Sequence, residues 1–110
     1  MYSYNQRNSK VADASKHKDN VTKATMLYIE VDSMTLDRLS RAFKVSGNTI
    51  NTWLCEAIAN NYVPNTTLCK KLINKHLTEY ENKHNIKSSC LRQMYEAAIA
   101  SRNANLPVSV

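Results

Sequence analysis

The chain has 110 residues, of which 43% are hydrophobic, and a formal net charge of +6. A chain of this length buries one modest core, so we expect a single domain with a tail. Its charge balance is +3 over residues 1–24, −1 over residues 25–63 and +4 over residues 64–110. Positive ends favour anionic partners such as phosphate backbones. No segment approaches the roughly 18 apolar residues of a membrane helix, which excludes a membrane-spanning protein.

The cysteines and histidines indicate neither a disulfide framework nor a metal site. They are Cys55, Cys69, Cys90, His17, His76 and His84. An odd number of widely spaced cysteines is typical of a reducing compartment, and none of the intervals resembles a zinc ligand pair. The sequence also lacks a glycine-rich phosphate loop and a nucleophile–histidine spacing that would indicate catalysis. We therefore expect a cytoplasmic protein that is not an enzyme and needs no metal, cofactor or small-molecule substrate.

Residues 1–24 are polar, rich in Asn, Ser and Lys, and show no hydrophobic period. This composition predicts a flexible basic arm. Its lysines Lys10, Lys16 and Lys18 would attract phosphate groups without regard to base sequence, and this attraction would weaken with salt.

Residues 25–31 alternate between two kinds of side chain. The apolar set is Leu27, Ile29 and Val31, and the other set is Met26, Tyr28 and Glu30. This period predicts a short strand with one buried face. The alternative is that the run is the first turn of a helix or an unpaired extended segment.

Apolar residues at helical spacing predict four amphipathic helices after this run. Their expected N-caps are, in order, Asp32 or Ser33, Thr49, Thr66 or Thr67, and Ser88 or Ser89. The chain thus divides into a module over residues 25–63, a helical extension over residues 64–103 and a tail over residues 104–110. We expect the extension to mediate oligomerisation; the alternative is that its helices complete the core of the module.

Gly47 is the only glycine in the chain and lies between the first two of these helices. A single glycine at such a corner is expected where the backbone must adopt a positive φ. The sequence therefore predicts Gly47 at the left-handed position that ends the first helix, as the structural corner of the module.

The run from Leu27 through Ile58 resembles the ribbon-helix-helix family of Arc-type and MetJ-type repressors. The most specific part is G-N-T-I-N-T-W-L, which is similar to the Gly-x-Ser/Thr-aliphatic-Asn-Ser/Thr-x-aliphatic stretch of that family. The resemblance implies a mainly α fold with one short N-terminal strand, which pairs with the strand of a second chain. A homodimer results, and the helical extension could join dimers into a tetramer.

The same resemblance implies that the paired ribbon enters the major groove of double-stranded DNA. The residues expected to contact DNA are Lys23, Met26, Tyr28 and Glu30 from the strand region and Asn48, Thr49 and Asn51 from the second helix. Glu30 argues against base contacts by this strand, because a carboxylate repels phosphate and is favourable only beside a cytosine amino group or a nearby cation.

A second resemblance covers residues 39–54, L-S-R-A-F-K-V-S-G-N-T-I-N-T-W-L. It is similar to the Phe-Gly-Val-Ser-x-x-Thr-Ile-x-x-Trp-Leu signature of helix-turn-helix proteins of phages and transposons. This alternative implies an all-α bundle. Ser46, Asn48, Asn51 and Thr52 would then contact bases, with Arg38 and Arg41 available for phosphates. Because Asn pairs with the adenine edge, this set would suit adenine-rich sites.

The helix-turn-helix alternative has a local cost. It places Lys44 in the left-handed corner and Gly47 in the first turn of a helix, and each placement costs about 1 kcal/mol. It also leaves the alternation of residues 25–31 unexplained. For these reasons the sequence favours the ribbon.

These features predict a sequence-specific DNA-binding transcriptional regulator, a dimeric repressor or autoregulator. Its pattern resembles regulators of phages and plasmids, which act in the bacterial cytoplasm or in a phage-infected host cell. The alternative is a helical protein-interaction module, an inhibitor or adaptor that binds no DNA. The acidic balance of residues 25–63 supports that alternative.

Overall fold

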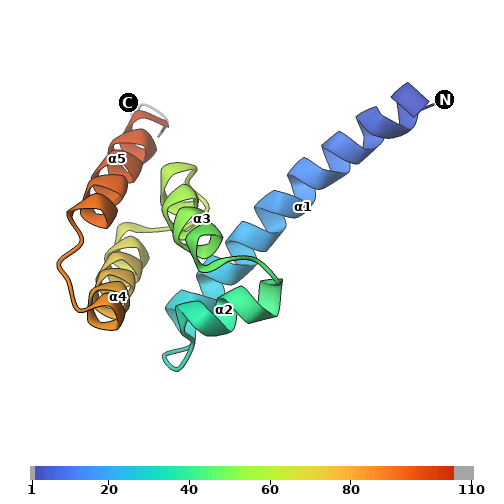
Figure 1. The fold of residues 1–110 in the computed structure, drawn as a ribbon. Helices are drawn as coiled ribbons and strands as arrows, with labels where there is room; N and C mark the ends of the chain where they lie inside the picture. The colour runs from blue at the N-terminus through green and yellow to red at the C-terminus, as the bar shows by residue number, and fades with distance from the viewer. Residues whose placement is uncertain (1, 106–110) are drawn as a thin grey trace.

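The computed structural model describes the backbone of residues 2–105 and the side chains of residues 14–104. The described part of the chain is all-helical (Figure 1). Its helices are α1 (Tyr2–Glu30), α2 (Leu36–Phe43), α3 (Gly47–Ala59), α4 (Thr66–His84) and α5 (Ser89–Asn105).

The predicted strand over residues 25–31 is wrong, because this segment forms the last turns of α1. The side chains that it buries recur at helical spacing and continue a stripe that begins earlier in α1: Val21, Ala24, Thr25, Tyr28 and Ile29. Over seven residues, a two-residue period and a helical stripe share several positions, and the buried positions before residue 25 decide between them. The ribbon-helix-helix fold and its strand-paired dimer are therefore overturned, and the all-α alternative fits.

The segment predicted as a flexible arm, residues 1–24, is also helical from Tyr2 onward. Its last turns belong to the core, since Val21 and Ala24 are fully buried. Lys16 and Lys18 are exposed on α1, and the side chain of Lys10 lies outside the described residues. The first half of α1 points away from the other helices (Figure 1).

The residues that cap the helices are of the type predicted from the sequence. Ser88 caps α5 as predicted, with its Oγ accepting the Leu91 N–H at 3.0 Å. The caps of α2, α3 and α4 lie one to three residues from the predicted ones. Thr35 caps α2, Ser46 caps α3 and Asn65 caps α4. All three are the short polar residues that an N-cap requires, so the chemistry was predicted but the exact position was not.

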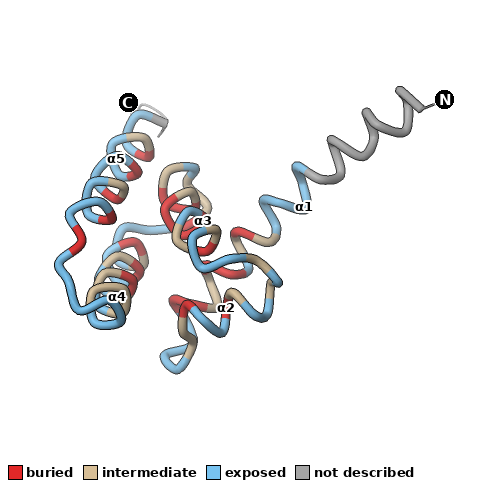
Figure 2. The backbone as a smooth tube through the Cα atoms, in the orientation of Figure 1, coloured by how far each residue is buried: buried red, intermediate tan, exposed pale blue. Residues whose placement is uncertain are grey.

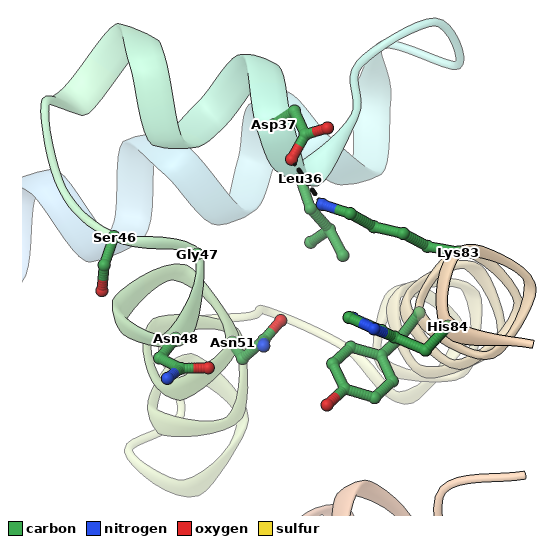
Figure 3. Close-up of a pocket in the computed structure, with 9 residues that line it drawn as sticks. Leu36, Asp37, Ser46, Gly47, Asn48, Asn51, Lys83 and His84 are labelled. Carbon is green, nitrogen blue, oxygen red and sulfur yellow. Dashed lines mark hydrogen bonds and ion pairs between the residues drawn. The ribbon is translucent and has the colours of Figure 1, made fainter. Parts of the chain in front are cut away.

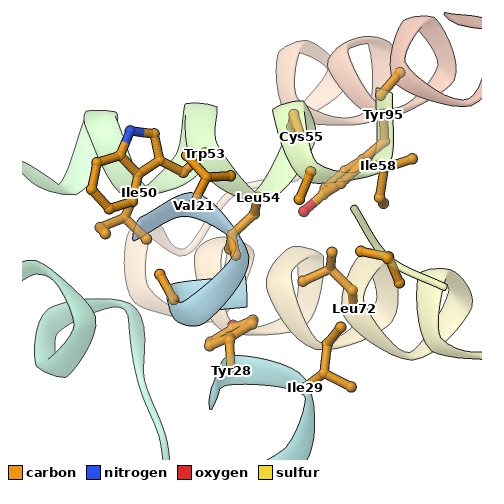
Figure 4. Packing of buried hydrophobic residues seen from close by; sticks show 14 of the residues in the cluster. Val21, Tyr28, Ile29, Ile50, Trp53, Leu54, Cys55, Ile58, Leu72 and Tyr95 are labelled. Atoms are coloured by element: carbon orange, nitrogen blue, oxygen red, sulfur yellow. The ribbon is translucent and has the colours of Figure 1, made fainter. Parts of the chain in front are cut away.

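The core surrounds α3, which packs against α1, α2 and α5, while α4 packs against α1 and α5. Figure 4 shows Tyr28 of α1, Leu54 of α3, Leu72 of α4 and Tyr95 of α5 converging on one cluster. Figure 2 shows the same arrangement along the backbone, with buried residues on the sides of the helices that face each other. The second half of the chain thus completes the core of the first half, as the alternative for the helical extension expected.

Two charged side chains of α4 tie the helices together. The carboxylate of Glu79 accepts the Tyr28 hydroxyl at 2.7 Å and the Leu36 N–H at 2.8 Å. The Lys75 Nζ donates to the Tyr28 carbonyl at 2.7 Å, an acceptor that the end of α1 would otherwise leave open. It also donates at 3.0 Å to the Val31 carbonyl, which accepts the Met34 N–H as well. None of the described helices combines the length and the apolar character that crossing a bilayer requires.

Candidate nucleic-acid interface

A three-residue turn joins α2 to α3, and its first residue, Lys44, is left-handed with φ 57° and ψ 46°. The N–H groups of Lys44 and Val45 both donate to the carbonyl of Ser40. The Ser40 hydroxyl in turn donates to the Val45 carbonyl. Ser46 then caps α3, with its Oγ accepting the Thr49 N–H at 3.1 Å. Short turns of this kind join the helices of αα-hairpins as well as those of helix-turn-helix units.

The prediction for Gly47 is wrong. Gly47 is the first residue of α3, no described glycine has a positive φ, and Lys44 occupies the left-handed position instead. A Cβ added at Gly47 would meet nothing within 4 Å, so no close contact requires a glycine there. The local cost of about 1 kcal/mol at Lys44 is small compared with the burial of side chains such as Leu39 and Ile50, at about 1.5–3 kcal/mol each.

The first turns of α3 present a polar surface. Gly47, Asn48 and Thr52 are exposed, and Thr49 and Asn51 are partly exposed. The opposite side of the same turns carries Ile50, Trp53 and Leu54, which are buried in the core. The amphipathic pattern of α3 therefore orients its polar side outward at the N-terminal end.

A cavity of about 300 Å³ lies between this polar surface and the C-terminal end of α4. Figure 3 shows Asn51 projecting from α3 into the space between the two helices, opposite Lys83 and His84. The Lys83 Nζ lies 2.6 Å from the Asp37 Oδ1 on α2, and this contact lowers the pKa of the Asp37 carboxyl.

A second cavity, of about 260 Å³, lies on the other side of α3, where α1 contributes His17. The His17 Nε2 is 2.9 Å from the Glu56 Oε2, and the imidazole meets Trp53 edge-on at 5.9 Å between ring centroids. The carboxylates that flank the polar surface, Asp37 and Glu56, thus each have a basic partner. The ion pair with Lys83 reduces the repulsion that Asp37 would exert on an anion at α3.

Beneath the polar surface, Asn51 is the outer member of a chain of hydrogen bonds. Its Oδ1 lies 2.7 Å from the Nε2 of His76 on α4, and the His76 Nδ1 contacts the hydroxyl of Tyr95 on α5. His76 is 0% exposed, and burial lowers its pKa from 6.5 to about 4. His76 is therefore neutral at physiological pH.

The structure divides the residues that were predicted to contact DNA into two groups. Four of them share the polar surface of α3: Asn48, Thr49, Asn51 and Thr52. Arg38 and Arg41 are exposed on α2, the helix that precedes α3 in the sequence. The Arg41 Nε also donates to the Asp37 carbonyl at 3.4 Å.

The remaining group, from the predicted strand, lies on α1. Tyr28 cannot contact DNA, because it is fully buried, and burial together with its bond to Glu79 raises the pKa of its hydroxyl. Met26 packs against the core, while Lys23 and Glu30 are exposed. Once the segment is helical, Tyr28 lies on a different face from Met26 and Glu30, with which it would alternate outward on a strand.

Sequence patterns did not indicate the residues that flank α3: His17, Tyr80, Lys83 and His84. Each belongs to a helix far away in sequence, and only packing brings it to the site. The one available signal was the basic pair Lys83 and His84 in the last turn of α4, which also suits the negative end of the helix dipole.

Within the described residues, no three or more His, Cys, Asp or Glu side chains are grouped so as to hold a metal ion. Comparison with protein-family models, curated protein sequences and solved structures finds no match to this chain.

Proposed function

We propose that this protein binds double-stranded DNA through α2 and α3, used as a helix-turn-helix with α3 as the recognition helix. The observation that carries the proposal is the left-handed corner at Lys44, followed by a capped helix whose first turns are polar and exposed. Recognition helices of this class contact base edges with their N-terminal residues, while the preceding helix crosses the phosphate backbone.

The chemistry of the exposed side chains suits base contacts. The Asn48 side chain makes no hydrogen bond to any residue that the structure describes, so its amide can both donate to and accept from a base edge. That pair of bonds is the one that selects adenine in the major groove. Thr52 is exposed one turn later, although its Oγ1 already donates to the Asn48 carbonyl at 3.0 Å.

Phosphate contacts would come from the cations around this surface. Arg38, Arg41 and Lys44 are exposed on α2 and at the corner, and Lys16 and Lys18 are exposed on α1. The free N–H groups at the start of α3 favour an anion at the same end. Such contacts fix the orientation of a protein on the duplex, and base contacts then supply the sequence preference.

A role as a transcriptional regulator, a repressor or autoregulator, belongs to this proposal through the helix-turn-helix resemblance of residues 39–54. A homodimer on a two-fold symmetric site also remains a prediction. The strand pairing that first suggested it is gone, so a dimer would have to form through helical surfaces.

A second candidate is a protein-interaction module, which one observation favours. An open groove of about 440 Å³ runs between α3 and α5, and its lining is almost entirely apolar. Cys55 of α3 and Met94, Ala97 and Ala98 of α5 contribute to it. Apolar grooves of this kind receive apolar side chains of partner proteins. The two candidates predict different behaviour, because a protein-interaction module would show no salt-dependent affinity for DNA.

The test measures the affinity for random-sequence duplex DNA and for duplexes selected by the protein, at several salt concentrations. We expect affinity for random duplex to fall steeply with salt, and Arg38→Ala to weaken binding to all duplexes and to reduce the salt slope by about 1. Asn48→Ala should reduce affinity for the selected duplex by roughly 5- to 100-fold and leave affinity for random duplex nearly unchanged.

Matched controls come from α4. Lys70→Ala removes an exposed cation about 20 Å along the helix from Lys83, and Asn74→Ala removes an exposed amide. Both should leave affinity and salt slope as in the unmodified protein. Salt-insensitive or absent binding would favour the protein-interaction module, and equal effects of the α3 variants and these controls would remove α3 from the interface.

A further inference from the structure

The side chain of Asn51 is held from inside the protein. His76 and Tyr95, its partners in the hydrogen-bond chain, are 0% and 2% exposed. The imidazole is also fixed in orientation, because the rings of Tyr28, Tyr80 and Tyr95 meet it edge-on at centroid distances of 6.2, 6.4 and 5.4 Å. Asn51 therefore reaches the surface with an orientation set by three other helices.

The hydrogen bonds determine which nitrogen of His76 carries the proton. A neutral imidazole has one N–H, and the Asn51 Oδ1 can only accept. The Nε2 must then donate to Asn51, so the Nδ1 carries no proton and accepts from the Tyr95 hydroxyl. With the Asn51 oxygen facing the imidazole, both bonds are satisfied only with the proton on Nε2.

The consequence for Asn51 is that its carbonyl oxygen is turned inward onto the fully buried His76, away from a ligand at the surface. The amide N–H groups remain for contacts in the two cavities that Asn51 and Tyr80 both line. Asn48, one turn earlier, makes no side-chain hydrogen bond within residues 14–104, so both its oxygen and its nitrogen can contact a base. Asn48 and Asn51, which the sequence predicts to contact bases in the same way, thus differ in the hydrogen bonds that they can offer.

We infer that the buried pair Tyr95 and His76 makes Asn51 a donor-only contact, which selects a base edge rich in acceptors instead of adenine. This inference rests on the proposed binding of DNA by α3. Guanine presents N7 and O6 and thymine presents O4 in the major groove, whereas adenine and cytosine each place an amino group there. His76 and Tyr95 are positioning residues in this arrangement, because they act only through Asn51.

The first part of the test needs no DNA. The ¹H–¹⁵N NMR signals of the His76 imidazole report which nitrogen is protonated, and we expect a protonated Nε2 and an unprotonated Nδ1 from pH 6 to pH 8. A protonated Nδ1 would leave the Asn51 oxygen without its donor and would overturn the inference.

The second part selects duplexes from a random pool with the unmodified protein and with Asn51→Ala, His76→Leu and Asn74→Leu. The position that loses its preference in Asn51→Ala identifies the base that Asn51 contacts. We expect guanine or thymine there over adenine by at least about fivefold in the unmodified protein. His76→Leu should shift that position toward adenine, because the Asn51 oxygen becomes free, and the exposed α4 control Asn74→Leu should not.

The outcomes separate the two proposals. Adenine at that position in the unmodified protein, no shift in a folded His76→Leu, or no position that responds to Asn51→Ala would each overturn this inference while DNA binding stands. If His76→Leu does not fold, the base preference of the unmodified protein at the position that Asn51 contacts still tests the inference. Absence of DNA binding together with the expected tautomer would overturn the proposed function, and the base preference with it.

Discussion

His76 shows what burial does to a single titratable side chain. Its imidazole makes two hydrogen bonds in the neutral form, and burial lowers its pKa from 6.5 to about 4. Between these two pH values the unfolded chain binds a proton at His76 and the folded chain does not. Acid therefore favours the unfolded state, and the stability that His76 confers above pH 6.5 is lost as pH falls toward 4.

We expect the free energy of unfolding to drop by roughly 2 kcal/mol between pH 7.5 and pH 5 through this one group. Urea unfolding at the two pH values measures the drop. The variant His76→Met should lose less stability over the same interval, even though its stability at pH 7.5 is lower. The exposed His84→Gln should behave like the unmodified protein. Equal pH dependence in His76→Met and the unmodified protein would contradict the assignment.

At the scale of the element, two residues at the corner between α2 and α3 adopt backbone conformations that their residue types disfavour. Lys44 is left-handed, where a side chain is disfavoured by about 1–2 kcal/mol, and Gly47 occupies a helical turn, where glycine costs about 1 kcal/mol relative to alanine. Both costs are tolerated because the helices on either side are buried against α1 and because Ser40 completes the turn with its hydrogen bonds.

Substituting either residue should remove its conformational cost. We expect Gly47→Ala to raise the free energy of unfolding by about 0.5–1 kcal/mol, since an added Cβ meets no atom within 4 Å. Lys44→Gly should raise it by up to about 1 kcal/mol, because glycine adopts a positive φ without steric cost. Chemical denaturation measures both changes, and Ala42→Gly on the exposed side of α2 calibrates the cost of glycine in this protein. A loss of stability in Gly47→Ala would contradict the observed register of α3.

At the scale of the whole molecule, the first three helices do not close a core by themselves. Leu54 and Ile58 of α3 are fully buried in a cluster that also contains Leu72 of α4 and Tyr95 of α5. The Arg102 guanidinium of α5 donates to the Val63 carbonyl at 2.8 Å, which ties the last helix to the loop after α3. Removing α4 and α5 would expose this apolar surface to water.

We therefore expect a chain of residues 1–63 to show no cooperative thermal transition by circular dichroism. A chain of residues 1–104 serves as the control and should melt like the full chain, because the buried residues described in the structure all precede residue 104. A cooperative transition in the shorter chain would mean that residues 25–63 form an independent module, as the sequence first suggested.

The sequence alone determined the amphipathic stripes of α2 to α5, the chemistry of their caps and the polar face that carries Asn48 and Thr52, because these depend on residues within one or two turns. It could not decide between strand and helix for residues 25–31, nor between Lys44 and Gly47 at the corner. The local alternatives there differ by about 1 kcal/mol, and packing against distant helices contributes more than that. The pairing of Asn51 with His76, 25 residues away, was likewise decided only by the tertiary structure, because no local pattern shows which buried nitrogen faces which oxygen.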